Sequence, residues 1–97
     1  MINFNIIILV IVMNNLEKYY EKENFVKTIK YNLRRVIKEK NISVNDLSLM
    51  IDLQFQSVAD MLSMTLIERY PSLETLRKIC IATQSDIQEF FKPIPEE

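Results

Sequence analysis

Residues 43–62, SVNDLSLMIDLQFQSVADML, constrain the fold most because they carry the start and end signals of short helices. Ser43 can cap a first helix, and Asp46 three residues later makes a near capping box. Asp52 stands where this helix should end, and Asp tolerates left-handed backbone better than most residues. The stretch therefore predicts two short helices joined by a tight turn.

The apolar residues of this stretch indicate how the two helices pack. Leu47 and Ile51 share one helical face, and Ser48 is small where the helices would cross closely. The second helix opens at Gln54 or Phe55 and turns three residues inward: Val58, Met61 and Leu62. This order of large, small and β-branched residues around a turn is typical of a helix-turn-helix. It resembles the lambda-repressor-like family of the Cro or xenobiotic-response-element type.

The flanking sequence extends the resemblance. Residues 25–40 predict an amphipathic helix with one apolar stripe: Phe25, Val26, Ile29, Leu33, Val36 and Ile37. PSLETL at residues 71–76 closely matches a helix start of the family, with Ser72 as its cap. The inner face of that helix is expected to hold Leu73, Leu76, Ile79 and Cys80. The resemblance covers residues 25–91 and implies an all-α domain of about five helices.

Other signals mark the ends of helices. Asn41 follows the first long helix, and Asn is the best residue after Gly for a left-handed C-cap. Asp86 with Glu89 suggests a second capping box before a last short helix. Pro93 and Pro95 are expected to end the ordered structure.

The first 24 residues differ from the rest of the chain. Eight consecutive large apolar residues run from Ile6 to Met13, which is too short to span a bilayer. The run lacks the basic start and small-residue cleavage site of a signal peptide. Three interpretations stay open: a translation-start artefact with Met13 as the real start, a strand or helix packing on the domain or on a second copy, or a weak membrane anchor. We expect no stable membrane insertion.

The chain divides by these patterns into three parts. Residues 1–24 form an apolar segment followed by a linker or short helix, residues 25–91 the helix-turn-helix domain, and residues 92–97 a C-terminal tail.

Composition excludes several classes of function. The chain has no His, no Gly and the single Cys80, so it offers no Cys/His zinc site and no Gly-rich phosphate loop. Cys80 also lacks a His to act as its base. We therefore expect no enzyme activity, no cofactor and no metal, and a cytoplasmic protein.

The resemblance implies a site for double-stranded DNA around the two motif helices. The residues expected there are Ser43, Val44, Asn45, Gln54, Phe55, Gln56, Ser57, Asp60 and Arg69. Gln56 can bond an adenine edge, and Phe55 can contact a thymine methyl group. Asp60 would repel phosphate or accept from a cytosine amine.

A basic face is predicted on the helix of residues 25–40, formed by Lys27, Lys30, Arg34 and Lys38. Residues 27–40 hold six Lys or Arg and one Glu, a net charge of +5. This face is either an ordinary solvated surface or a site for phosphates or an acidic protein.

The motif departs from the family in its charges. The family often pairs a buried Arg with a Glu, and the matching positions here are Ile37 and Leu62, which we expect to touch in the core. Replacing both charged partners by packed apolar residues can be neutral or stabilising. Residues 41–68 hold four acids and no Lys or Arg, which opposes phosphate binding.

Two functions therefore remain. The first is a DNA-binding transcriptional regulator of the phage or mobile-element repressor type, binding operator DNA as a homodimer. The alternative is a protein-interaction module on the same scaffold, such as an antirepressor, an antitoxin-like partner or a phage-type inhibitor of a host nucleic-acid enzyme. Leu49, Met50 and Phe55 are its candidate contact residues. Leu49 and Met50 are apolar where the family is usually polar and exposed, and Phe55 cannot hydrogen-bond to a base.

Overall fold

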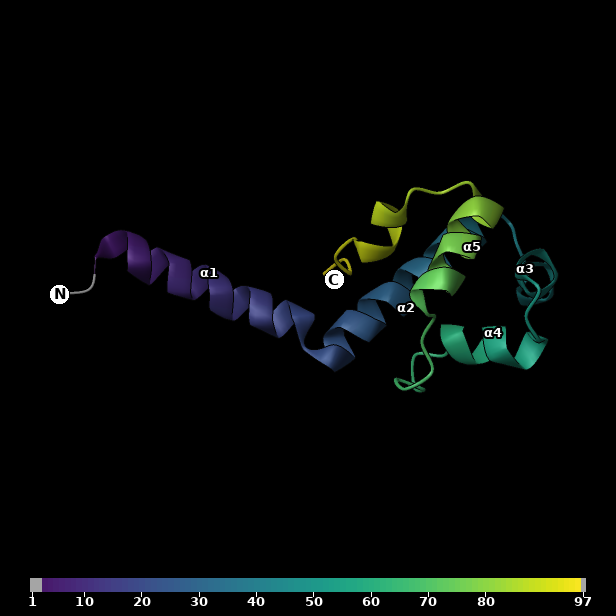
Figure 1. Ribbon diagram of the computed structural model, residues 1–97, viewed down its shortest axis with the longest axis horizontal. Helices are drawn as coiled ribbons and strands as arrows, with labels where there is room; N and C mark the ends of the chain where they lie inside the picture. Colours follow the sequence, from purple (N-terminus) through teal and green to yellow (C-terminus); the bar gives the residue numbers. More distant parts are fainter. Residues whose placement is uncertain (1–2, 97) are drawn as a thin grey trace.

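The computed structural model describes residues 3–96, and every regular element in that range is a helix. In chain order they are α1 (Phe4–Tyr20), α2 (Lys22–Glu39), α3 (Val44–Ile51), α4 (Phe55–Leu62), α5 (Leu73–Thr83) and the 3₁₀ helix η1 (Ile87–Phe91). Figure 1 shows α2 to η1 gathered into one body and α1 extending away from it. The all-α prediction is confirmed, with η1 as the last of the five helices of the domain.

Three helices end on a left-handed residue, although the chain contains no Gly. These residues are Asn41, Asp52 and Gln84, with φ of 58°, 55° and 54°. After Asn41 the amide of Ile42 donates to the carbonyl of Ile37 at 2.8 Å, which closes a Schellman motif. The left-handed predictions for Asn41 and Asp52 are confirmed, whereas Gln84 carried no sequence signal.

The core lies between α2 and the other helices of the domain. Its buried apolar residues are Ile29, Leu33, Val36, Ile37, Leu47, Ile51, Val58, Met61, Leu62, Leu76, Ile79 and Phe90. Leu73 was expected in this core but is 77% exposed. The buried side of α5 runs through Leu76, Ile79 and Thr83, and the 100° step of a helix places Leu73 to one side of that line.

The second predicted capping box is wrong in one half. The side chain of Asp86 does cap η1, because it accepts from the amide of Gln88 at 2.9 Å. Glu89 turns away from the cap, however, and its carboxylate pairs with Arg35 at 3.1 Å and Lys92 at 2.9 Å. The 3₁₀ geometry and these two cations decide its direction.

The apolar run and the polar residues after it, for which the sequence left a linker or a short helix open, form one continuous helix, α1. The residues Ile6–Met13 each keep 44–58% of their surface exposed, so this run does not pack on its own domain. No helix among residues 3–96 is long and apolar enough to cross a membrane. Residues 1 and 2 lie outside the described part of the chain.

The root of α1 is attached to the domain through aromatic residues. The Tyr19 hydroxyl donates to the carbonyl of Phe91 at 2.8 Å. The ring of Tyr20 lies 5.4 Å from that of Phe25, which in turn stacks on Phe91 at 5.8 Å. The direction in which α1 leaves the domain is therefore held by specific contacts.

Candidate nucleic-acid interface

The start of α3 is capped as the sequence predicts. The hydroxyl of Ser43 accepts from the amide of Asp46 at 3.0 Å, and the Asp46 carboxylate accepts from the amide of Ser43 at 3.2 Å. Asp52 then ends α3 in the left-handed region, and the amide of Leu53 donates to the carbonyl of Ser48 at 3.0 Å. α4 begins directly after this turn at Phe55.

The inner faces of α3 and α4 are closed to solvent. Leu47, Ile51 and Val58 are at most 2% exposed, and the small Ser48 is buried beside them. Ile37 and Leu62, the positions of the family's charged pair, are buried in the same cluster. The apolar pattern around the turn therefore builds the core that orients α4.

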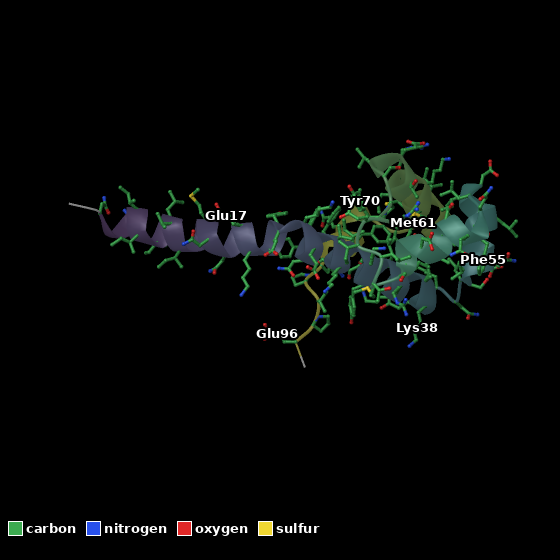
Figure 2. All side chains as sticks on the ribbon, turned by 90° about the horizontal axis from the view of Figure 1, so that it is seen from below. Glu17, Lys38, Phe55, Met61, Tyr70 and Glu96 are labelled. Atoms are coloured by element: carbon green, nitrogen blue, oxygen red, sulfur yellow. The ribbon has the colours of Figure 1, made fainter. Side chains whose placement is uncertain are left out.

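The outer face of α4 carries the residues that the sequence proposed for base contacts. Phe55 is 52% exposed, Gln56 and Ser57 are exposed, and Asp60 is half-buried. The Gln56 amide nitrogen donates to the Asp60 carboxylate at 2.8 Å, one helical turn away. Figure 2 places Phe55 at the opposite end of the molecule from Glu17 of α1. The outer face of α4 is thus remote from the α1 arm.

The prediction that Lys30 lies on an exposed basic face is wrong. Lys30 is 0% exposed, and its ammonium group donates to the carbonyls of Asp60 at 2.9 Å, Met61 at 3.0 Å and Arg69. Burial lowers the pKa of Lys30. Lys30 precedes Ile37 by seven residues, or about two turns, so it lies on the edge of the apolar stripe. That spacing was the signal that sequence reasoning missed.

Arg34 also binds a backbone carbonyl at the end of α4. Its guanidinium donates to the carbonyl of Leu62 at 3.1 Å, so Arg34 and Lys30 together bind the last carbonyls of α4. Cations are favoured there, because the end of a helix carries unpaired carbonyls and partial negative charge. Lys27 is paired with Glu23 at 2.9 Å, which leaves Lys38 as an exposed member of the predicted face without a carboxylate in ion-pair range among residues 3–96.

A groove of about 1070 Å³ lies where α2, the start of α3 and α4 meet. Its lining comprises Tyr31, Arg34, Arg35, Ile37, Lys38, Asn41, Ile42, Ser43, Val44, Asp46, Ala59 and Leu62. Arg35 forms ion pairs with Glu39 at 3.2 Å and with Glu89 at 3.1 Å. The groove therefore brings Lys38 and Arg34 beside the capped start of α3, although the motif itself contains no cation.

A family model of the Cro/C1-type HTH DNA-binding domain matches residues 32–96. The chain belongs to this family. No curated protein and no solved structure matches the chain. The match confirms the resemblance seen around residues 43–62 and identifies α3 and α4 as part of a DNA-binding domain. It begins within α2 and leaves α1 outside the family region.

The other candidate residues of the Cro/C1-type domain lie at the starts of α3 and α4 and in the loop after α4. Asn45 is exposed on the first turn of α3, and Val44 is half-buried in the groove. Gln54 is the exposed N-cap residue of α4, and its side chain makes no cap hydrogen bond in the described structure. Arg69 has an exposed side chain, while its carbonyl holds Lys30. Seven of the nine residues proposed from sequence are thus exposed, and the other two, Val44 and Asp60, are half-buried.

The loop after α4 contains contacts that the sequence did not reveal. Glu68 pairs with Lys22 at the start of α2 at 2.7 Å, and the Lys22 ammonium lies 5.9 Å from the centre of the Tyr70 ring. These contacts tie the loop of the Cro/C1-type domain to α2, and so to the same helix that holds the end of α4. Cys80 is half-buried, and burial raises the pKa of its thiol.

Proposed function

We propose that the chain is a transcriptional regulator of the phage or mobile-element repressor type that binds two-fold operator DNA as a homodimer. The observation that carries this proposal is the outer face of α4, which stays open in a Cro/C1-type domain while its inner face and its last carbonyls are fixed. A rigid helix with an open face suits insertion into the major groove.

Gln56 is the proposed base-reading residue. A glutamine bonds adenine with one N–H and its carbonyl oxygen. An amide nitrogen has two hydrogens, so the bond from Gln56 to Asp60 leaves one hydrogen and the oxygen for the base. Asp60 thereby orients Gln56, and Phe55 stands at the start of α4 where it can contact a thymine methyl group.

Phosphate contacts are proposed at the groove. The amides at the start of α3 favour anions, and Lys38 and Arg34 supply positive charge that residues 41–68 lack. Arg69, in the loop after α4, adds an exposed cation near the end of α4, where its carbonyl binds Lys30 together with those of Asp60 and Met61. With so few free cations, we expect weak non-specific binding and a shallow dependence of affinity on salt.

The test is a selection from random duplexes in low salt with the full chain, followed by binding measurements on the enriched site. Gln56→Ala should cost about 1–3 kcal/mol of binding free energy and relax one base position. Arg69→Ala should weaken all sequences alike and reduce the salt slope by about one. Gln88 is an exposed glutamine of η1, so Gln88→Ala serves as the matched control. It should leave the binding free energy, the base preference and the salt slope unchanged.

If the selection enriches no site, the DNA proposal for this chain fails. The alternative is then a protein-interaction module of the antirepressor, antitoxin-like or enzyme-inhibitor kind. One observation favours it: Leu49, Met50 and Phe55 expose 74%, 50% and 52% of their surface around the turn of the motif. Phe55→Ala would then be the most damaging change to partner binding, since an aromatic anchor commonly dominates such contacts.

A further inference from the structure

α1 presents the largest run of apolar side chains without a partner in the molecule's described part. All eight residues of Ile6–Met13 are about half exposed, as are Leu16 and Tyr20. A monomeric protein rarely leaves such a surface in water, because burying it is favourable by about 25 cal/mol per Å². The apolar face of α1 therefore needs a partner surface that the domain of its own chain does not provide.

The spacing of the apolar residues indicates another helix as that occupant. Leu9, Val12, Leu16 and Tyr19 recur at intervals of three, four and three residues, which is the a/d pattern of a two-stranded coiled coil. In the second half of α1 the other side of the helix is polar, with Asn14, Asn15, Glu17 and Lys18. From Ile6 onward, the side of the helix that stays apolar includes this seam, whereas Asn5, four residues before Leu9 in the same pattern, is polar.

Charge points to a second copy of the same helix. Residues 3–16 contain no Lys, Arg, Asp or Glu, so two copies of α1 can approach without repulsion along this part. A surface-lying membrane helix would instead carry a polar face rich in Lys or Arg, and residues 3–16 offer none.

The position of α1 also fits a contact between copies. The Tyr19 hydroxyl bond to Phe91 directs the helix away from the domain, and the molecule measures 59 Å along its longest axis. Figure 1 shows α1 at one end and α3 and α4 at the other. A second copy can therefore pack on α1 while both outer faces of α4 stay open.

We propose that α1 is a dimerisation helix that packs on α1 of a second copy through Leu9, Val12 and Leu16. The proposal rests on the proposed function only in taking the assembly to be a homodimer. Two helices of 17 residues packed along one face bury roughly 800 Å² in total. Standard interfaces bury at least about 1,200 Å², so we expect a weak dimer with a Kd in the micromolar range.

The test measures the monomer–dimer equilibrium of the full chain by sedimentation, without DNA. Leu9→Glu places a charge in the seam and should raise the dimer Kd by about tenfold or more. Ile7→Glu makes the same kind of change on the far side of α1, at 45% exposure against 58% for Leu9, and should alter the Kd by less than about threefold. Circular dichroism checks that both variants keep their helical domain.

Three results would overturn the proposal. They are a wild-type chain that stays monomeric at several hundred micromolar (about a hundred times the Kd expected for such an interface), equal effects of Leu9→Glu and Ile7→Glu, and co-flotation of a monomeric chain with vesicles of phosphatidylcholine and phosphatidylglycerol. The last result would assign α1 to a lipid surface. A dimer that selects no DNA site would leave this proposal intact and refute the proposed function. A monomer that binds single half-sites would overturn this proposal and retain only the DNA-binding part of the proposed function.

Discussion

α1 and the α3–α4 pair show opposite relations between the apolar content of a helix and its burial. α1 has 17 residues and an unbroken apolar run, yet that run is about half exposed. α3 and α4 have eight residues each, and Leu47, Ile51 and Val58 are almost completely buried. Isolated helices of eight residues are not stable in water. The contrast shows that contacts from distant residues, rather than apolar content, hold the motif helices.

The α3–α4 pair is held from three directions. Ser43 and Asp46 cap the start of α3, α5 packs against α3 and α2 against α4, and Lys30 and Arg34 bind the last carbonyls of α4. In the described residues, α1 is fixed at its root, through Tyr19 with its aromatic neighbours and through Asn24, which donates to the carbonyl of Lys18. Mutations should therefore destabilise the domain strongly at the motif and hardly at all in the apolar half of α1.

The largest effect is expected at the base of α4. Leu62→Glu buries a carboxylate without a partner and should lower the free energy of unfolding by about 2–4 kcal/mol. Adding Ile37→Arg should recover part of this loss, since it restores the charged pair that the family often has. Urea denaturation of both variants checks the prediction. A double variant no more stable than Leu62→Glu alone would show that these two positions do not form a pair.

Removal of the buried ammonium should come next. Lys30→Met keeps the length of the side chain but leaves three carbonyls without their donor, at a cost of about 1–3 kcal/mol in unfolding free energy. Lys38→Met on the exposed side of the same helix should change stability by less than about 0.5 kcal/mol. Similar values for the two variants would contradict a structural role specific to Lys30.

The cap of α3 is expected to contribute less. Ser43→Ala removes the hydroxyl that accepts from the amide of Asp46 and should cost about 1 kcal/mol of stability. The control is Ser57→Ala, because Ser57 is an exposed serine of α4 and makes no cap bond in the described structure. This substitution should leave the stability nearly unchanged. Thermal unfolding of the pair separates the effect of the cap from that of a lost hydroxyl group.

Deletion of residues 1–12 should have the smallest effect on the domain. It retains Tyr19 and the bond to Phe91, and among the described side chains it removes those of Ile6 to Val12, which are about half exposed. Measured at a concentration low enough for copies to be monomeric, the free energy of unfolding should change by less than about 0.5 kcal/mol. Loss of the cooperative transition would show that the apolar run belongs to the core.

Much of the motif could be predicted because its signals are local. The capping box of Ser43 and Asp46 and the left-handed Asp52 depend on residues within a few positions of one another. Helical periodicity alone predicts that the side chains of Val58 and Leu62 face the core, where both are buried. Leu73 and Glu89 were misplaced because their directions depend on how α5 and η1 pack, which periodicity does not report.

The helix-turn-helix and its membership of an all-α domain follow from the order of residues, because caps, turns and apolar spacing act over one or two helical turns. Whether Lys30 is buried and binds carbonyls depends on packing, since its carbonyl partners lie 30, 31 and 39 residues further along the chain. The exposure of α1 depends on packing as well, because its apolar run is equally typical of a core segment when judged from the sequence alone. A charged or apolar side chain has the same local pattern whether it is buried or exposed, and only the approach of distant backbone distinguishes the two.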